Sequence, residues 1–368
     1  MGLEHIQEEI LSRLPVKSLI RFKRVSKSWK TLISEPYFKK KHLNHAKNHN
    51  SRKLLISQSG YGQDHTFTFY SSSLSSVQLV KDIQRLDWPL NSKTIHARVY
   101  CCCDGLFLIG IWSNVEEEHP SILLLWNPAT RESIVLSHSE LPPSELSLYG
   151  LGYDSTSNDY KVVRIDGYDY YTPDEILVLK SGSWKKIDKT TYRSDGWLCA
   201  SHDNMDGLVF VHGALHWLGC EPRFTVVSFD ISNEMYGEIP LLKIMHSFTM
   251  KTGLSVLGGM LCVHCNKHET FNLWVMYDYG VKESWIKSFT IPQKQYGFCF
   301  ITPIYRFPDD EVLLFCNLKK VGTVFRTFDA SFRLSNRIWP LDCDDIDART
   351  IQDGFVYTES LISPKLDH

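Results

Sequence analysis

The sequence predicts a mainly β protein that begins with a small helical module. Three observations support this fold class. Apolar residues up to Leu43 recur at helical spacing and are interrupted by two prolines. From Leu54 onward, short segments rich in Val, Ile, Tyr, Phe and Trp alternate with Gly, Asp, Asn and Ser, which is the pattern of strands and turns. Two separate markers in this second part recur about every 50 residues, which indicates a repeated sheet unit.

The helical module is predicted as three short helices within residues 1–44. Leu14-Pro15 closes the first helix and Pro36 closes the last, because proline cannot continue a helix. A unit of this size cannot bury all of its apolar surface alone, so we expect a partner protein to cover part of it. The apolar residues at helical spacing are Ile6, Ile10, Leu11, Leu14, Val16, Leu19, Ile20, Val25, Trp29, Leu32 and Ile33.

A polar stretch, HAKNHNSRK at residues 45–53, is predicted as a linker, and residues 54–363 as the β domain, with a tail at 364–368. The β domain contains two markers with one period. A turn that leads into an apolar strand recurs in steps of 54, 54, 46 and 51 residues, and a polar turn between two strands recurs in steps of 53, 50, 48 and 51. The first marker begins at Gly105, Asp159, Gly213, Gly259 and Asp310, and the second includes Asn127, Lys180, Asp230, Asp278 and Asp329.

This period is close to the length of a kelch-type blade, so the sequence predicts a kelch-like β-propeller of about six units. Leu54 to Ile95 supplies one degenerate unit. The segment from Phe355 to Ser363 is expected to complete a blade or seal the ring, because closure leaves few sheet edges exposed.

The helical segment from Glu8 to Leu43, EEILSRLPVKSLIRFKRVSKSWKTLISEPYFKKKHL, resembles an F-box. The EIL, RLP, KSL, RFK, V-x-K-x-W, LI and P-x-F elements occur in the family order and spacing. The resemblance implies docking onto a Skp-type adaptor, which links to a cullin and a RING protein in an SCF ubiquitin ligase. The adaptor contacts that we expect are Ile10, Leu14, Pro15, Leu19 and Val25, whereas Trp29 and Leu32 fit the core of the module equally well.

The β domain resembles the F-box-associated domain of a large group of plant F-box proteins. The segments that carry this resemblance are LLLWNPATRE, YGLGYDSTSNDYKVVRI, GALHWL, VVSFDISNE, EIP, WVMYDYGVKESWIKSFTI and YTESLISP. Relatives of this type include the pollen F-box proteins of self-incompatibility loci. The two resemblances together cover nearly the whole chain.

The resemblances imply a non-catalytic, substrate-recognition subunit of an SCF-type ubiquitin ligase. The propeller is expected to bind the target protein through loops at one mouth, because loops vary while blades support them. Candidate loops run from Trp112 to His119, from Asp166 to Asp174 and from Arg193 to Asp203.

Three alternatives stay open. The first is a pollen S-locus-type protein that recognises S-RNases, and the second is a kelch-type enzyme such as a metal-dependent oxidase. The third is an F-box protein uncoupled from the ligase, because family members usually carry Leu-Pro where this chain has Gly2 and Leu3.

Composition indicates a cytoplasmic or nuclear protein without cofactors. Residues 1–53 contain 13 Lys and Arg against 4 Asp and Glu, but these bases fit the solvated faces of short helices, and the rest of the chain is acidic, which opposes nucleic-acid binding. No stretch of 18 apolar residues is present, and the first residues do not resemble a signal peptide. The 10 cysteines are therefore expected to be free thiols.

The sequence offers weak candidates for metal sites and none for catalysis. Cys262 and Cys265, with His264 and His268, have zinc-ligand residue types, but alternation along a strand places the two thiols on opposite faces. Cys101 and Cys103 should share one face, with Cys102 on the other. The acidic cluster from Asp342 to Asp347 lacks the Gly and Glu of an EF-hand, Glu116 to Glu118 indicates a charged loop, and Trp217 and His216 indicate core positions. Common nucleotide-binding, hydrolase and metalloprotease motifs are absent.

Overall fold

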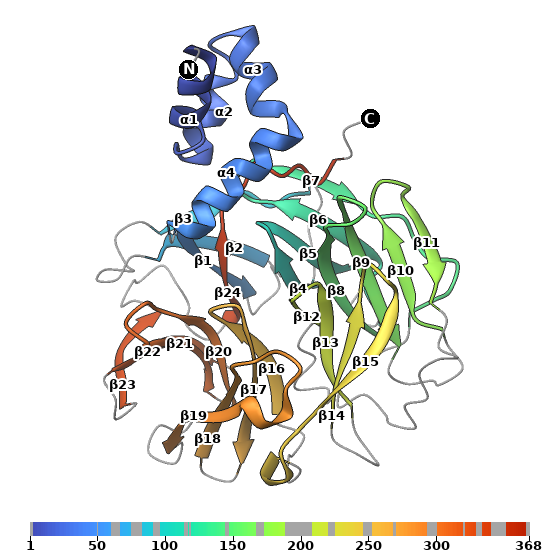
Figure 1. Ribbon diagram of the computed structural model, residues 1–368, viewed down its shortest axis with the longest axis vertical. Helices are drawn as coiled ribbons and strands as arrows, with labels where there is room; N and C mark the ends of the chain where they lie inside the picture. The colour runs from blue at the N-terminus through green and yellow to red at the C-terminus, as the bar shows by residue number, and fades with distance from the viewer. Residues whose placement is uncertain are drawn as a thin grey trace.

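In the computed structural model of the chain, the strands form a ring and the helices stand at its rim (Figure 1). The structure describes residues 3–49, 51–59, 67–74, 83–90, 96–113, 117, 119–143, 147–166, 173–187, 208–219, 225–245, 252–267, 270–292, 300–318, 321–328, 333–339 and 351–365.

The N-terminal module contains four helices, not the three predicted: α1 (Leu3–Leu11), α2 (Val16–Phe22), α3 (Lys27–Ser34) and α4 (Pro36–Asn48). The prediction at Pro15 is confirmed, since α1 has ended before it and α2 begins directly after it. The helix before Pro36, α3, also ends as predicted, at Ser34, but it is not the last helix of the module. Pro36 is the first residue of α4, a position where the missing N–H is unpaired in any helix and the fixed φ suits helix entry.

The linker predicted for residues 45–53 is also wrong. Helix α4 continues to Asn48, and strand β1 begins at Arg52. The polar sequence reflects a helix that buries only a narrow side, formed by Phe38, Lys39, His42 and Leu43. Because its remaining surface is polar, the periodicity of α4 is weak in the sequence.

In the part of the chain that the structure describes, the strands form six four-stranded antiparallel sheets, in agreement with the predicted β-propeller. Neighbouring strands follow one another along the chain in five of these sheets, whereas in the first the last strand, β24, pairs with β1. The sheets, called blades 1 to 6 here, are β24-β1-β2-β3, β4-β5-β6-β7, β8-β9-β10-β11, β12-β13-β14-β15, β16-β17-β18-β19 and β20-β21-β22-β23.

Most of the repeat of about 50 residues lies within the strands of the sheets. The strands are β1 (Arg52–Ser59), β2 (Phe67–Ser73), β3 (Gln84–Leu86), β4 (His96–Cys103), β5 (Leu106–Trp112), β6 (Ile122–Asn127), β7 (Glu132–Val135), β8 (Ser147–Asp154), β9 (Asp159–Asp166), β10 (Glu175–Val178), β11 (Ser183–Lys186), β12 (Val209–Val211), β13 (Ala214–Gly219), β14 (Thr225–Asp230), β15 (Met235–Pro240), β16 (Thr252–Leu257), β17 (Met260–Lys267), β18 (Thr270–Met276), β19 (Trp285–Pro292), β20 (Phe300–Arg306), β21 (Val312–Leu318), β22 (Val321–Phe328), β23 (Arg333–Trp339) and β24 (Ile351–Thr358).

The ring is closed by pairing the last strand with the first. Strand β24 lies antiparallel to β1, with Arg52 opposite Thr358 and Leu55 opposite Phe355. The expectation that the C-terminal segment completes a blade is therefore confirmed. This pairing joins the two ends of the β domain and covers the edges that an open array would expose.

The hydrophobic core is divided into layers between neighbouring blades. One layer, between blades 1 and 2, includes Phe69 and Trp126, and another, between blades 2 and 3, includes Leu108 and Leu177. Equivalent layers lie between the other pairs of neighbours. Blade strands that are buried on both faces therefore read as continuous apolar runs in the sequence.

The predicted positions of the cysteines agree with these layers. Cys102 packs in the layer between blades 1 and 2, whereas Cys101 and Cys103 pack in the layer between blades 2 and 3. The six cysteines that the structure describes are free thiols. Trp217 packs in the core between blades 3 and 4, as expected.

The turns of the blades divide the ring into two faces. The turns after the innermost strands and after the third strands lie at one end of the sheets, which we call the module face. Its tight turns place Asp104-Gly105, His212-Gly213 and Gly258-Gly259 at positive φ, as short hairpin turns require. The loops after the second and fourth strands belong to the opposite end, which we call the loop face.

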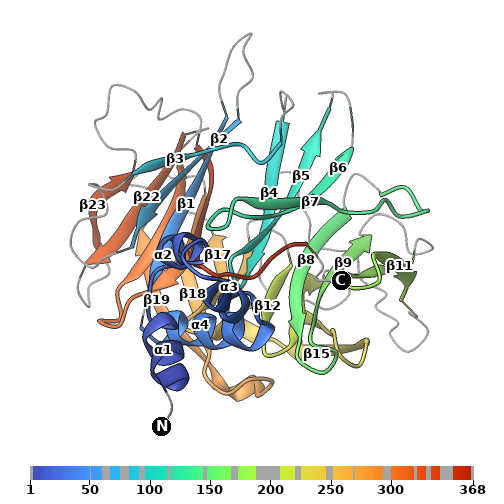
Figure 2. The same ribbon diagram turned by 90° about the horizontal axis from the view of Figure 1, so that it is seen from above.

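The helical module packs on the rim of the module face, with α4 against the ring (Figure 2). The core of the module contains Leu19, Ile33 and Phe38, together with Leu361 from the C-terminal segment. Ala129, from the turn between β6 and β7, packs against the same core. The module and the propeller therefore share a core rather than burying separate ones. No described helix has the length and apolar character needed to cross a membrane.

Candidate functional site

The helical module keeps several large apolar side chains on its surface. Val25 is 66% exposed and Ile10 is 58% exposed, which is far more than a core residue allows. Ile6, one helical turn before Ile10 on the same face of α1, is 47% exposed, and Tyr37 at the start of α4 is also exposed. Exposed apolar side chains gathered on so small a unit are typical of a protein-binding surface.

The other predicted adaptor contacts are less accessible. Leu19 is fully buried in the core of the module, so its side chain is not available to a partner in this conformation. Leu14 is half-buried against the same core, and its carbonyl accepts a hydrogen bond from His42 Nε2 at 2.9 Å. Pro15 is exposed at the start of α2. Sequence spacing could not separate Leu19 from Ile10, because both are apolar positions on short helices.

Trp29 and Leu32 are half-buried and pack on the edge of the module core. The Trp29 ring lies 5.3 Å from the Phe22 ring, between centroids, and the Trp29 amide donates to Ser26 Oγ at the N-terminus of α3. These contacts hold α2 and α3 together. The two residues therefore belong to the edge of the module core.

The C-terminal residues Glu359 to Ser363, here called the strap, run between the module and blade 2. Asn127 holds the strap, because its Nδ2 donates to the carbonyl of Ser360 at 3.1 Å and to that of Ile362 at 2.7 Å. The Oδ1 of the same side chain accepts from the Ala129 amide at 2.9 Å and so shapes the β6–β7 turn. Asn127 is completely buried. One amide side chain thus fixes both the turn and the strap that contact the module.

Gly105 allows the strap to approach the ring. It has φ of 82°, and an added Cβ would lie 2.7 Å from the carbonyl oxygen of Thr358. Ser360 Oγ donates to the carbonyl of the preceding residue, Asp104, at 2.6 Å. Only glycine combines this backbone conformation with so close an approach.

Charged groups form three further contacts between the module, the strap and the ring, and two of them come from α4. Lys47 Nζ lies 2.5 Å from Asp104 Oδ1, and Asp104 also accepts from Tyr160 OH at 3.0 Å. Lys53 pairs with Glu359 at 2.6 Å. Lys40 lies over the Tyr153 ring, 5.4 Å from its centroid. The module is therefore held to blades 2 and 3 by polar contacts as well as by the shared core.

A buried ion pair ties blade 3 to blade 4 on the module face. Lys161 Nζ lies 2.9 Å from Asp154 Oδ2 and donates to the carbonyl of Ile231 at 2.6 Å. Ser232 of blade 4 donates to Asp154 Oδ1 at 2.6 Å. Burial alone would raise the pKa of Asp154, but hydrogen bonds from Ser232, Ser157 and Lys161 outweigh it and hold that pKa well below its usual range.

The three predicted target-binding loops belong to the loop face. Strands β5 and β6 flank the first, β9 and β10 the second, and β11 and β12 the third. These strands meet the loops at the ends away from the helical module. Of the loops themselves, Arg193 to Asp203 and most of Asp166 to Asp174 lie outside the described residues, as do Glu116, Glu118 and the cluster from Asp342 to Asp347.

Hydrogen bonds between polar side chains fix the bases of the first two loops. At the base of the first loop, Ser113 Oγ and Ser121 Oγ lie 2.7 Å apart. At the base of the second, Asp174 accepts from the Asp166 amide at 3.0 Å and from Tyr236 OH of blade 4 at 2.6 Å. Both loops therefore start from fixed ends.

The weak metal candidate does not form a single ligand set. Cys262 packs between blades 5 and 6, whereas Cys265 packs between blades 4 and 5, on the other side of the same sheet. His268 lies outside the described residues. Burial raises the pKa of the Cys262 and Cys101 thiols to about 12, and such thiols are poor nucleophiles near neutral pH.

Two histidines in the propeller are buried in the neutral form. Burial lowers the pKa of His216 and of His264 to about 4. His216 Nε2 lies 2.8 Å from Tyr279 OH, which reaches it from the β18–β19 turn of blade 5. This contact joins blades 4 and 5 on the module face, so His216 has a structural role.

Sequence reasoning missed the joint between module and ring. The signal was present in two quoted segments, because Asn127 belongs to WNPATRE and the strap to YTESLISP. Those segments lie more than 230 residues apart, and the hydrogen bonds between Asn127 and Ser360 are what bring them together. Spacing along the chain carries no information about such a pair.

Comparison with protein families and known proteins agrees with this architecture. Residues 4–41 match the F-box domain, and residues 61–363 match the F-box associated beta propeller domain. The chain is 27% identical to the F-box protein CPR1 of Arabidopsis thaliana, over 86% of this chain and 80% of that protein. It is 30% identical to an F-box/kelch-repeat protein of Arabidopsis thaliana, over 78% of each chain.

Among solved structures, the hydrazine synthase of Kuenenia stuttgartiensis superposes with a TM-score of 0.50 at 10% identity, covering 86% of this chain and 48% of that one. This likeness concerns the fold alone. The two domain matches cover most of the sequence, in the order that the structure shows. The chain belongs to the plant-type F-box proteins that carry an F-box-associated β-propeller domain.

Proposed function

We propose that this F-box protein binds a Skp-type adaptor through the exposed apolar side chains of its helical module and a target protein through the loop face of its propeller. F-box proteins of this kind are substrate-recognition subunits of SCF-type ligases and are generally non-catalytic. The observation that carries the adaptor part is the exposure of Ile10 and Val25 on a module whose core is already filled.

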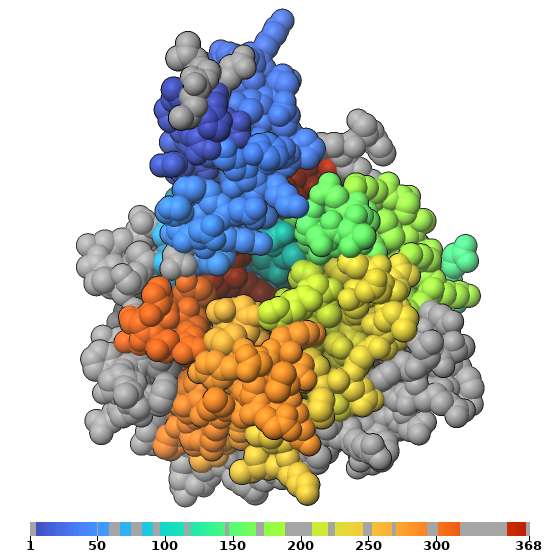
Figure 3. Space-filling view, in the orientation of Figure 1, coloured from blue at the N-terminus to red at the C-terminus, as the bar shows by residue number. Residues whose placement is uncertain are grey.

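The proposed mechanism is proximity. A target held by the propeller has a high effective concentration at the ubiquitin carrier, so no residue of this chain needs to perform chemistry. The module stands out from the ring and leaves much of its surface free, which supports access for an adaptor (Figure 3). The strap and α4 contacts support a fixed orientation between the two binding surfaces. The proposed location of this protein is the cytosol or the nucleus, where it could assemble with an SCF ligase.

The adaptor proposal is tested with surface variants. The double variant Ile10→Asp, Val25→Asp places two charges on the proposed contact surface without touching the module core. Truncating central apolar anchors of an interface costs about 2 kcal/mol or more, and burying charge costs further, so we expect at least about a hundredfold weaker binding to a purified Skp-type adaptor.

The matched control is Met235→Asp, because Met235 is a half-exposed apolar residue of the propeller, at 50%. It should bind the adaptor as wild type does. Leu14→Ala with Pro15→Ala is a poorer test, since Leu14 supports the module core. Equal adaptor affinity of the Ile10/Val25 variant and wild type, measured by biolayer interferometry, would refute the proposed surface.

A further inference from the structure

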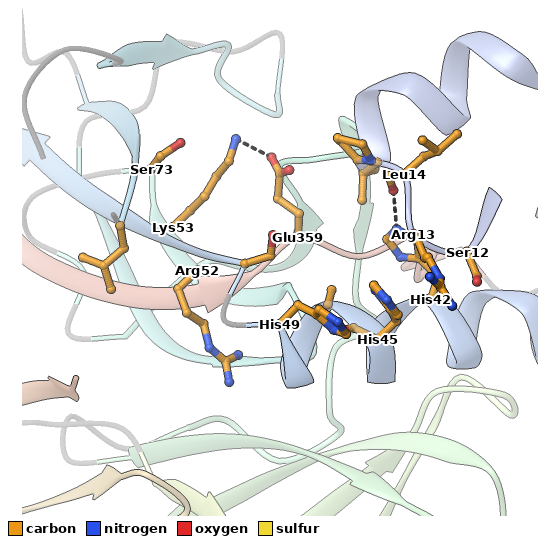
Figure 4. A pocket seen from close by; sticks show the side chains of 15 residues that line it. Ser12, Arg13, Leu14, His42, His45, His49, Arg52, Lys53, Ser73 and Glu359 are labelled. Atoms are coloured by element: carbon orange, nitrogen blue, oxygen red, sulfur yellow. Dashed lines mark hydrogen bonds and ion pairs between the residues drawn. The ribbon is translucent and has the colours of Figure 1, made fainter. Parts of the chain in front are cut away.

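A groove of about 450 Å³ lies between the helical module and blade 1. Its walls are the α1–α2 connection, the inner side of α4, the start of β1, the end of β2 and the strap (Figure 4). The loop face does not include it, and of the expected adaptor contacts only Leu14 and Pro15 line it. Residues from both domains therefore enclose one space at the joint.

The charged side chains around this groove are mainly basic. Arg13, Arg52 and Lys53 contribute three cations, while Glu359 is the one carboxylate among the described lining residues. Lys53 neutralises Glu359 at 2.6 Å, which leaves two arginines. Arg13 is two-thirds exposed and reaches Glu9 only at 3.8 Å. Arg52 donates to the neutral Thr358 Oγ1, and no described carboxylate forms an ion pair with it.

His42 and His45 of α4, and His49 directly after its end, also line the groove. The rings of His45 and His49 are stacked, with centroids 3.9 Å apart.

Two buried nitrogens at the groove have no hydrogen-bond partner among the described residues. They are His42 Nδ1 and Arg52 Nε. His42 is only 4% exposed, and its other nitrogen, Nε2, is engaged by the Leu14 carbonyl. Buried polar atoms are nearly always satisfied, so each such atom in a groove needs an explanation. A ligand that offers acceptor oxygens would provide one for Arg52 Nε, and for His42 Nδ1 once that nitrogen is protonated.

We propose that this groove binds a small multivalent anion of the phosphate type, such as an oligophosphate or a phosphorylated metabolite, between the F-box module and the propeller. Guanidinium groups suit phosphate oxygens because they present several N–H donors in one plane. The volume accommodates more than one phosphate group, and ligands from both domains would bind the same molecule. The bound anion would strengthen the joint that the strap and α4 already form.

The same geometry couples binding to proton uptake. In neutral His42 the Nε2–H donates a hydrogen bond to the Leu14 carbonyl, so Nδ1 carries a lone pair and cannot donate to an anion. Burial first, and then the neighbouring His45, lower the pKa of His42, while the Leu14 carbonyl and Glu359 raise it. The other charged groups around it are Arg13, His49, Arg52 and Lys53, and an anion among them would raise the pKa of His42. The anion should therefore bind more tightly as pH falls.

The test is calorimetric titration of the full chain with sodium tripolyphosphate at constant ionic strength. We expect saturable binding that is about tenfold tighter at pH 6 than at pH 8. Titrations at pH 7 in buffers with different ionisation enthalpies should show net proton uptake. Absence of saturable binding at both pH values would overturn the proposal, as would net proton release.

Variants locate the site. The double variant Arg13→Gln, His45→Gln changes accessible side chains and should fold, which circular dichroism and the melting temperature check. It should weaken tripolyphosphate binding by about tenfold or more, and Arg52→Gln should weaken it further. The control Lys186→Gln removes an exposed cation of β11 outside the groove and should leave the affinity unchanged. Equal weakening by Lys186→Gln and by the groove variants would show non-specific charge attraction and overturn the assignment.

Discussion

The two faces of the propeller are built on the same strands but are held together differently. On the module face, short turns from neighbouring blades contact one another, as in Asp104 with Tyr160, Asp154 with Ser232, and His216 with Tyr279. On the loop face, longer segments join the strands, for example between Trp112 and Ile122 and between Lys186 and Val209. The module face therefore carries the contacts that fix the ring and the F-box module.

The difference between the two faces explains the positions of the two sequence markers that repeat about every 50 residues. Gly105, Gly213 and Gly259 lie in turns of the module face, and Asn127 and Asp230 end the strands β6 and β14 that lead into such turns. Asp230 Oδ1 accepts from the amides of Ser232 and Asn233, just as Asn127 Oδ1 accepts from that of Ala129. The residues that repeat along the sequence are those that shape the turns of the module face and hold the blades together. Loops that recognise different targets need no common sequence pattern.

The largest effect should come from breaking the buried ion pair on the module face. Lys161→Met removes the cation beside buried Asp154 and should lower the free energy of unfolding by about 3–5 kcal/mol, because an uncompensated buried charge remains. Urea denaturation followed by fluorescence measures this change. The double variant Lys161→Met, Asp154→Leu should recover part of the loss, and exposed Lys186→Met should change little. A Lys161 effect no greater than that of Lys186 would contradict this role.

The strap should give the next largest effect. Leu361→Ala removes a side chain that is 2% exposed in the module core and should cost about 2–5 kcal/mol in the stability of the joint. Hydrogen exchange should then quicken in α1 to α4 while the β21 and β17 amides remain protected. Met235→Ala is the control, since that side chain is half-exposed on β15. Uniformly faster exchange in all blades would show that the strap stabilises the whole ring rather than the joint.

Acid should weaken the core through His216 and His264. Their folded pKa of about 4 lies below the ordinary value of 6.5, so the unfolded chain binds more protons between these limits. Stability is therefore complete above pH 6.5 and falls as pH decreases toward 4, by on the order of 2 kcal/mol per histidine at pH 5. Unfolding curves at pH 7.5 and pH 5 measure this loss. His264→Leu should reduce the difference between the two pH values, and an unchanged difference would argue against a neutral buried His264.

The smallest effect on stability is expected on the loop face. Replacing residues 114–120 with Gly and Ser residues of equal number should change the free energy of unfolding by only about 0.5 kcal/mol, because surface loops contribute little to the core. The same change should alter the set of proteins that co-purify with the chain under proteasome inhibition. Mass spectrometry compares that set with the one from wild type. A strong loss of stability would mean that the loop supports the blades.

The sequence alone determined the local elements with strong patterns. Glycine and aspartate turns followed by apolar runs could be predicted because a tight hairpin needs positive φ and a blade strand is buried on both faces. The opposite orientations of Cys101 and Cys102 follow from the two-residue period of a strand, and the end of α1 before Pro15 follows from the chemistry of proline. The F-box and the propeller were recognised for the same reason: their motifs are local.

Tertiary structure decided everything that depends on distant parts of the chain. Helix α4 was missed because it is stabilised by burying Phe38 and His42 at the joint rather than by a strong apolar stripe of its own. Whether an apolar residue is core or surface was also undecided, and packing buried Leu19 while it left Ile10 and Val25 exposed. The strap, the groove at the joint and the pairing of Asp154 with Ser232 depend on closing the ring, which brings residues from different blades into contact.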